Sequence, residues 1–252
     1  EEWEKTVTRM GRWVDFENDY KTMDTPFMET IWWVFAQLWE QGRIYKAHRI
    51  MPYSWKLNTP LSNFEAGRNY QDVQDPAITV RAKLLDFEFE NASALVWTTT
   101  PWTLPSNLAI CAGPEIDYVA IKDKETHEVF LMAEARVAAY YKNEAEYEIL
   151  KSYKGKELEG LKYEPIFDFF ADNENSFQVL VDGFVSTEDG TGIVHMAPAY
   201  GEDDYRVCRG YGIPLVDPLD EDCVFTSAVP DYAGRFCKEA DKAIIKALKH
   251  GG

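Results

Sequence analysis

Basic residues are scarce in this chain. Its 252 residues include 26 lysines and arginines against 43 aspartates and glutamates, so the formal net charge is −17 at pH 7. A surface this acidic repels nucleic acid at long range. Any contact with RNA would have to be local, through the basic clusters at residues 43–49 and 151–156. We therefore expect no tight, autonomous binding of RNA.

Cysteines and long apolar runs are also few. The four cysteines lie far apart without a Cys-x-x-Cys spacing: Cys111, Cys208, Cys223 and Cys237. This pattern favours neither a zinc site nor a disulfide framework, so a reducing cytoplasm and no bound metal are expected. The longest apolar run, residues 31–36, is far shorter than the roughly 20 residues of a membrane span. The chain is therefore expected to be soluble, with no membrane partner.

Several catalytic signatures are missing from the sequence. It has no Gly-x-x-x-x-Gly-Lys phosphate loop, no His-Glu-x-x-His pair and no Gly-x-Ser-x-Gly elbow. Gly190 and Gly192 have the spacing of a dinucleotide-binding loop, but His195 stands where the third glycine would be. These absences disfavour nucleotide hydrolases, metalloproteases, serine hydrolases and Rossmann dehydrogenases.

The apolar pattern predicts helices near both ends. Thr25 is the expected N-cap of the first, Pro26 suits its first turn, and Gly42 ends it. A second helix is expected where alanine, isoleucine and leucine recur at helical spacing over residues 240–248, and a short third one at about 133–141.

Short runs of β-branched and aromatic residues occupy the middle of the chain. They predict strands at 78–85, 95–98, 118–121, 129–132, 179–185 and 193–196. With 46% hydrophobic residues the chain can bury a substantial core. The sequence therefore predicts an α+β fold: a β-barrel-like or curled sheet over residues 76–230, a connecting stem with a helix over 1–75, and a C-terminal return helix over 231–252.

The expected stem is rich in tryptophan. Two interpretations remain open for its five tryptophans: they form a local core with the C-terminal helix, or they are exposed because a partner surface is absent. We favour the local core, since aromatic residues at helical spacing are usually buried. The five are Trp3, Trp13, Trp32, Trp33 and Trp39.

Two segments carry the side chains expected to do chemistry. Residues 97–107 place four threonine hydroxyls within six positions beside two prolines, which favours polar recognition by a stiff loop. Residues 190–205 supply His195 and, nine positions later across a Pro and Gly turn, Asp204. We expect both segments to face one cavity.

These two segments resemble the signature segments of the editing insertion in class I aminoacyl-tRNA synthetases. The Thr-Thr-Thr-Pro-Trp form at 98–102 differs from the leucine type, which leaves the isoleucine and valine types. Residues 10–16, the Trp-Trp helix and residues 58–65 look like isoleucyl-tRNA synthetases of the eukaryotic kind. The resemblance covers nearly the whole chain. The His-x-Gly-His and Lys-Met-Ser-Lys-Ser motifs of amino-acid activation are absent, so no synthetic activity is expected.

The resemblance implies an ester hydrolase that proofreads. One methylene in a hydrophobic pocket is worth only about 1–3 kcal/mol, and isoleucyl-tRNA synthetases are the standard example of the need for a second sieve. The implied substrate is valine esterified to the terminal adenosine of isoleucine tRNA, with valyl-adenylate as a further candidate. A valine-type domain that hydrolyses threonyl esters and a catalytically idle interaction module are the alternatives.

The resemblance also implies a role for each site residue. Asp204, in preference to Asp203, pairs with the α-ammonium of the substrate. The catalytic hydroxyls Thr98, Thr99 and Thr100 bind the terminal adenosine and the ester, while Thr103 and His195 line the side-chain pocket. Substrate binding is further assigned to Trp97 and, at the edge of the site, to Asn107.

No general base is assigned, and attack by water assisted by a ribose hydroxyl of the substrate is favoured. Tyr200 stands where many relatives have histidine or phenylalanine, which affects the pocket mouth. The implied partners are the aminoacylated 3′ end of tRNA and the remainder of a parent synthetase. No cofactor is expected in this region, since ATP and magnesium belong to the parent enzyme, and the isolated chain is expected to be monomeric.

Overall fold

The computed structural model describes residues 2–251 and divides into two compact units. The first ends at His48 and the second begins at Arg49. The three-part division at residues 75 and 230 stays a prediction.

The first unit contains two helices, α1 (Glu2–Arg9) and α2 (Thr25–Glu40). The predicted N-cap of α2 is wrong by one residue. Asp24 is the N-cap: its backbone is extended, and its carbonyl accepts from the amides of Phe27 and Met28 at 3.0 and 3.1 Å. Thr25 is already helical, and Gly42 follows the helix end as expected.

The local core that the stem tryptophans are expected to form with the C-terminal helix stays a prediction, because that helix belongs to the second unit. Within the first unit all five tryptophans are exposed, from 55% for Trp39 to 99% for Trp13. Neither α1 nor α2 contains a buried residue, although α2 is rich in large apolar side chains. A helix of this composition is normally covered by other polypeptide.

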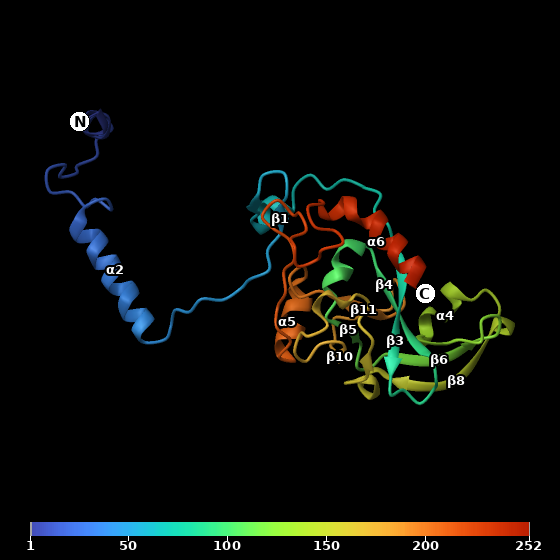
Figure 1. Cartoon of the computed structure of the whole chain (residues 1–252). Coiled ribbons are helices and arrows are strands. Elements are labelled where there is room, and N and C mark those ends of the chain that lie inside the picture. The colour runs from blue at the N-terminus through green and yellow to red at the C-terminus, as the bar shows by residue number, and fades with distance from the viewer. Residues whose placement is uncertain (1, 252) are drawn as a thin grey trace. The chain divides into compact units, whose positions relative to one another are not determined.

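The second unit is built on a curled nine-stranded sheet (Figure 1). Its strands are β3 (Ile78–Leu85), β4 (Ala92–Thr98), β5 (Ala109–Ala112), β6 (Asp117–Asp123), β7 (Val129–Ala133), β8 (Tyr147–Lys154), β9 (Lys162–Tyr163), β10 (Val179–Val181) and β11 (Ile193–Met196). The main path runs β10-β5-β11-β4-β7-β6-β8, while β3 pairs with β4 and β9. A separate hairpin joins β1 (Tyr53–Ser54) and β2 (Thr59–Pro60). The expected mixed fold with a curled sheet is confirmed.

Helices of the second unit are short except at its C-terminal end. They are α3 (Asn63–Ala66), α4 (Val137–Tyr140), α5 (Glu202–Gly210), α6 (Cys237–Gly251) and the 3-10 turns η1 (Pro101–Ser106), η2 (Glu134–Arg136), η3 (Glu144–Glu146), η4 (Gly155–Leu158) and η5 (Asp168–Phe170). The helix predicted at 133–141 is thus a 3-10 turn followed by one α-helical turn. The C-terminal helix α6 packs against η1.

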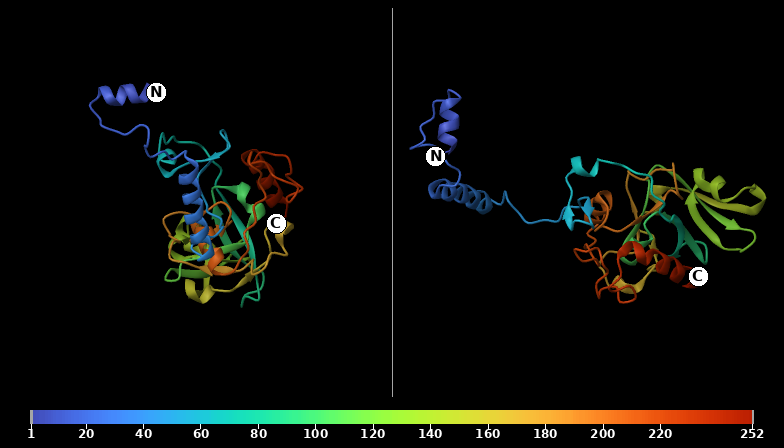
Figure 2. Two further views of the ribbon diagram at one scale, coloured as in Figure 1. Left: turned by 90° about the vertical axis from the view of Figure 1, so that its left-hand side faces the viewer. Right: turned by 90° about the horizontal axis from the view of Figure 1, so that it is seen from above.

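The core lies between the sheet and these helices. Along β3, buried and exposed residues alternate, whereas β5 and β7 are buried at every position. Strands β6 and β8, at one end of the sheet, appear in green and yellow in both views of Figure 2. The four cysteines are free thiols. Among residues 2–251, helices fall short of the length and apolarity needed to cross a membrane.

Candidate functional site

Sheet topology brings the two polar segments together. Strand β11 lies between β4, with which it runs parallel, and β5, with which it runs antiparallel. Val194 pairs with Trp97, and His195 pairs with Ile110. The end of β4, where the threonines begin, therefore lies beside the histidine strand, although about 95 residues separate them in sequence.

The threonine segment is fixed by its own hydroxyls. The Thr100 amide donates to Thr98 Oγ1 at 3.1 Å, and both the amide and the hydroxyl of Thr103 donate to the Thr100 carbonyl, at 3.0 and 2.8 Å. Pro101 opens the 3-10 turn η1, which follows directly. Thr98 and Thr103 are buried, Thr100 is half-buried and Thr99 is exposed. The loop is therefore rigid on the side that faces the protein.

His195 is buried at 6% exposure and both ring nitrogens have partners. Nε2 lies 2.8 Å from Thr103 Oγ1, and Nδ1 lies 2.8 Å from Asn107 Nδ2. Burial lowers the pKa of His195 to about 3, so the imidazole is neutral at physiological pH. A neutral ring whose nitrogens are both occupied cannot serve as a free base.

Asp204 lies in the first turn of α5 and is half-buried. Its Oδ2 accepts from the Ala197 amide at 2.8 Å. Burial raises the pKa of Asp204 to about 6, with a smaller contribution from the neighbouring charge of Asp203, while backbone hydrogen bonds oppose the rise. The carboxylate is thus ionised at neutral pH in a place that favours a compensating cation.

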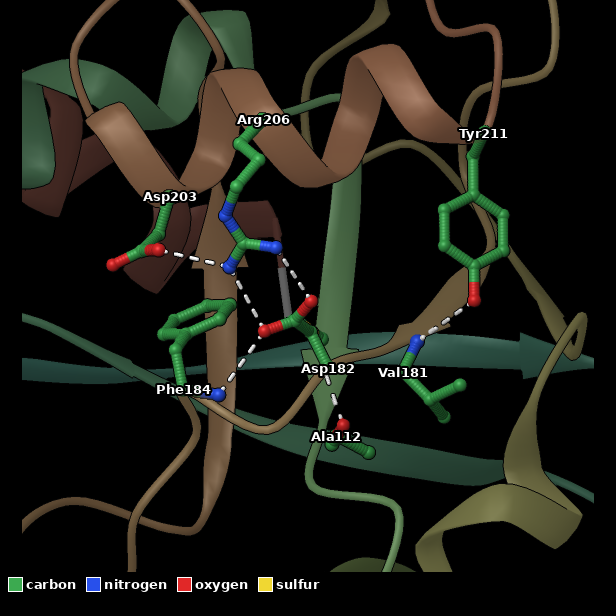
Figure 3. Close-up of polar contacts among 8 residues, drawn as sticks. Ala112, Val181, Asp182, Phe184, Asp203, Arg206 and Tyr211 are labelled. Atoms are coloured by element: carbon green, nitrogen blue, oxygen red, sulfur yellow. Dashed lines mark hydrogen bonds and ion pairs between the residues drawn. The ribbon is translucent and has the colours of Figure 1, made fainter.

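Asp203 belongs to a different cluster of polar contacts, drawn in Figure 3. Arg206 Nη2 donates to Asp203 Oδ1 at 2.9 Å. The same guanidinium makes two 2.9 Å hydrogen bonds to Asp182, which directly follows β10, and these lower the pKa of Asp182. The first turn of α5 is therefore tied to the edge of the sheet, and Asp203 is occupied by an arginine.

A cavity of about 260 Å³ lies where these elements meet. Seven of the nine predicted site residues line it: Trp97, Thr98, Thr99, Thr100, Thr103, His195 and Asp204. Asn107 and Asp203 do not. The prediction that Asn107 stands at the edge of the site does not match its position, because it is 3% exposed and its amide is used by His195, the Ala109 carbonyl and Tyr163.

Tyr200, which the resemblance placed at the pocket mouth, lines the cavity, and its hydroxyl donates to Asp217 at 2.9 Å. Three other lining residues were not predicted from the sequence: Trp102, Ser186 and Asp189. Trp102 packs edge-on against Tyr200 at 4.9 Å between ring centroids. Ser186 and Asp189, both exposed, complete the mouth. In the sequence, only the proximity of Ser186 and Asp189 to the Gly-Thr-Gly segment indicates a place in the site, since residues 186–189 have the composition of an ordinary hydrophilic turn.

Glycine is needed where the 190–192 segment passes under the pocket. Gly190 and Gly192 have φ of +64° and +75°. A Cβ at Gly190 would lie 2.9 Å from the Trp97 side chain, and one at Gly192 would overlap Ala133 Cβ. Left-handed backbone and lack of space both exclude larger residues here.

The chemistry available is that of a polar pocket whose half-buried carboxylate is Asp204. Hydroxyls and backbone amides of the threonine segment can hold an ester or ribose, and Asp204 can hold a cation. Among the described residues, the acidic, histidine and cysteine side chains do not form a group of three or more that could hold a metal ion.

Comparison with known proteins defines the class. Residues 1–221 match the family model described as tRNA synthetases class I (I, L, M and V), so the chain belongs to this family of enzymes. Over its whole length it is 50% identical to the cytoplasmic isoleucine–tRNA ligase of Mus musculus and 51% identical to the isoleucine–tRNA ligase of Bdellovibrio bacteriovorus. It spans 20% and 24% of the lengths of these two relatives.

Solved structures identify the part of such enzymes that the chain resembles. The crystal structure of GlLeuRS-CP1 matches with a TM-score of 0.52 at 15% identity, over 70% of this chain and 96% of that one. The P. knowlesi cytosolic leucyl-tRNA synthetase editing domain matches with a TM-score of 0.50 at 13% identity, over 71% and 94%. The chain thus has the fold of these editing domains.

Proposed function

We propose that this chain hydrolyses valine esterified to the 3′ end of isoleucine tRNA. The observation that carries the proposal is the convergence on one cavity of Asp204 with the hydroxyls of the threonine segment. A half-buried carboxylate with a pKa of about 6 is suited to the α-ammonium of an aminoacyl ester. The fold of editing domains and the identity to isoleucine–tRNA ligases support the same assignment.

Hydrogen bonding in the pocket wall favours valine over threonine as the side chain removed. Thr103 donates to the Thr100 carbonyl and pairs with His195 Nε2, while His195 Nδ1 pairs with Asn107. The polar groups of the wall are therefore engaged within the protein. A threonine hydroxyl placed here would lack a strong partner, whereas the isopropyl group of valine needs none.

The hydrolytic step is proposed to rely on positioning and not on a protein base. His195 is neutral and has no unoccupied nitrogen, and Asp204 is engaged once it holds the ammonium. Thr98 and Thr100 place the ester in the cavity, where polar groups of the threonine segment stabilise the developing oxyanion. A ribose hydroxyl of the substrate then assists the attacking water. The proposed reaction involves no cofactor from this chain, and valyl-adenylate remains a candidate second substrate.

The wider setting is proposed from the relatives. The chain works as part of a larger synthetase, on the aminoacylated 3′ end of tRNA, and in the cytoplasm, as the name of the mouse relative says of that protein.

Single-turnover deacylation tests this function. The chain, in excess, is mixed with isoleucine tRNA charged with valine, threonine or isoleucine, and release of amino acid is measured. We expect valyl ester to be cleaved faster than threonyl ester, isoleucyl ester to be spared, and Asp204→Ala to abolish cleavage without changing the circular dichroism. Preference for the threonyl ester would indicate the valine-type alternative, and cleavage of none would indicate an idle module.

A further inference from the structure

A run of buried hydrogen bonds leads from the pocket wall to a tyrosine outside it. Tyr163, the last residue of β9, is 1% exposed and does not line the cavity. Its hydroxyl donates to Asn107 Oδ1 at 2.7 Å. Asn107 is in turn hydrogen-bonded to His195, which does line the cavity. Two hydrogen bonds therefore connect Tyr163 to the pocket wall.

The direction of each hydrogen bond can be worked out. Burial raises the pKa of Tyr163, so its hydroxyl keeps its proton and donates to the amide oxygen of Asn107. The amide nitrogen then faces the Ala109 carbonyl at 2.9 Å and His195 Nδ1 at 2.8 Å. An amide turned by 180° would oppose its oxygen to the Ala109 carbonyl, which cannot donate, and would leave Tyr163 to accept where it now donates. The Ala109 carbonyl therefore excludes the turned amide, and the Tyr163 hydroxyl holds the amide oxygen in the observed orientation.

A fixed amide fixes the histidine. Because Asn107 Nδ2 donates to Nδ1, that nitrogen must be unprotonated, and the neutral ring carries its proton on Nε2. Nε2–H donates to Thr103 Oγ1 at 2.8 Å, which directs the Thr103 hydroxyl proton to the Thr100 carbonyl, also at 2.8 Å. The opposite tautomer would need the Thr103 hydroxyl proton at Nε2, and the Thr100 carbonyl would keep only the hydrogen bond from the Thr103 amide.

We propose that Tyr163 is a positioning residue of this pocket: through Asn107 it holds His195 in the Nε2–H tautomer and thereby sets the direction of the Thr103 hydroxyl. Its effect on hydrolysis rests on the function proposed above, whereas the tautomer does not depend on any substrate. Tyr163 contributes no surface to the cavity, so its role is confined to the tautomer of His195 and the direction of the Thr103 hydroxyl.

The test replaces Tyr163 with phenylalanine and reads the tautomer directly. In the unaltered chain labelled with ¹⁵N-histidine, NMR should show His195 with a protonated Nε2 and an unprotonated Nδ1. In Tyr163→Phe a population with protonated Nδ1 should appear, and kcat for valyl ester should fall about tenfold with KM changed less than about twofold, as for other residues that orient a functional side chain.

Tyr153→Phe is the matched control. Tyr153 is also buried, and its hydroxyl donates to Glu88 at 2.8 Å, outside the pocket. This variant should keep both the tautomer and kcat of the unaltered chain. If Tyr163→Phe does not fold, Asn107→Asp tests the same tautomer by NMR. A carboxylate at position 107 cannot donate to His195 Nδ1, so the ring proton should move to Nδ1.

Three results would overturn the proposal. The first is a protonated Nδ1 in the unaltered chain, the second an unchanged tautomer and kcat in Tyr163→Phe, and the third a retained Nε2–H tautomer in Asn107→Asp. Lack of valyl-ester hydrolysis by the unaltered chain would instead count against the proposed function, and the NMR result would still decide the role of Tyr163.

Discussion

At the residue scale, Asp204 is the group on which the proposed chemistry depends. It must be ionised to hold an ammonium ion, yet burial raises its pKa to about 6. Below pH 7 the substrate ammonium stays protonated, so only the carboxylate changes charge in this range. We predict that kcat/KM for valyl-ester hydrolysis rises with pH along an acid limb centred near pH 6. A profile that is flat between pH 5 and 7 would show that Asp204 does not titrate in the free enzyme.

The same shift has a consequence for stability. The pKa of Asp204 in the folded chain, about 6, lies above the ordinary aspartate value of 3.8, so the folded chain binds more protons than the unfolded chain between these values. Stability therefore falls as pH rises through this window, and the full cost of the buried charge applies above it.

Asp204→Asn removes that charge and keeps an oxygen that can accept from the Ala197 amide. We expect it to raise the free energy of unfolding by about 1–3 kcal/mol at pH 7.5, a range that allows for partial exposure of the group. The gain should shrink by more than half at pH 4.5. Urea titrations of both proteins at both pH values measure this, and an equal difference at the two would contradict the assigned pKa.

Thr103 and His195 are predicted to set the size limit of the pocket. Thr103→Ala removes a buried branch from the wall, so isoleucyl ester, spared by the unaltered chain, should be cleaved within about tenfold to a hundredfold of the valyl rate. His195→Ala should act in the same direction. Charged-tRNA deacylation measures the ratio, and unchanged discrimination in both variants would remove these residues from the wall.

At the scale of elements, the site depends on how the 190–192 segment passes beneath β4. Gly192 combines a φ of +75° with a Cβ position that overlaps Ala133, whereas Gly160 has a φ of +81° with open space around it. We predict that Gly192→Ala costs at least about 2 kcal/mol of stability, and Gly160→Ala about 1 kcal/mol, because only the first adds a steric clash to the backbone strain.

Thermal or urea unfolding of the two variants separates the effects. Equal destabilisation would mean that the clash at Gly192 is relieved by movement of β7, and that the close approach does not constrain the pocket.

Sequence periodicity predicted some elements better than others. The strands at 78–85 and 193–196 have the predicted bounds, because β-branched residues fill them and turn residues flank them. Strand β5 was missed because its four residues follow the proline-rich turn after only two positions, and β8 because its apolar and polar residues do not alternate. Such strands are stabilised by partners that are distant in sequence.

The same limit applied to the site. The threonine segment, His195 and Asp204 could be predicted because their residue types form local patterns. The position of Asn107 behind His195, and its hydrogen bond to Tyr163, depend on β5, β9 and β11 meeting in the fold. Local sequence patterns carry no information on which distant strands lie close together in the fold.

At the scale of the whole molecule, the exposed aromatic helix α2 and the acidic surface are features expected of one domain of a larger protein. The chain spans a fifth to a quarter of its curated relatives, so much polypeptide is available to cover α2. The lysines of one predicted RNA patch are neutralised, since Lys151 pairs with Glu88 at 2.6 Å and Lys154 with Asp117 at 2.7 Å.

We therefore predict that the isolated chain binds isoleucine tRNA weakly and that binding weakens further from about 50 to 200 mM salt. Fluorescence anisotropy with end-labelled tRNA measures the affinity at each salt concentration. An affinity equal to that of a full-length isoleucine–tRNA ligase, measured in parallel, would show that this chain carries the main tRNA contacts.

The central claim is that Asp204 receives the ammonium of an aminoacyl adenosine. A crystal structure of the chain with a non-hydrolysable valyl-adenosine analogue tests it most directly. We predict the ammonium within hydrogen-bonding distance of Asp204 and the isopropyl group against Thr103 and His195. An analogue bound with its ammonium elsewhere, or a pocket that stays empty under conditions where a full-length isoleucine–tRNA ligase binds the analogue, would contradict the account.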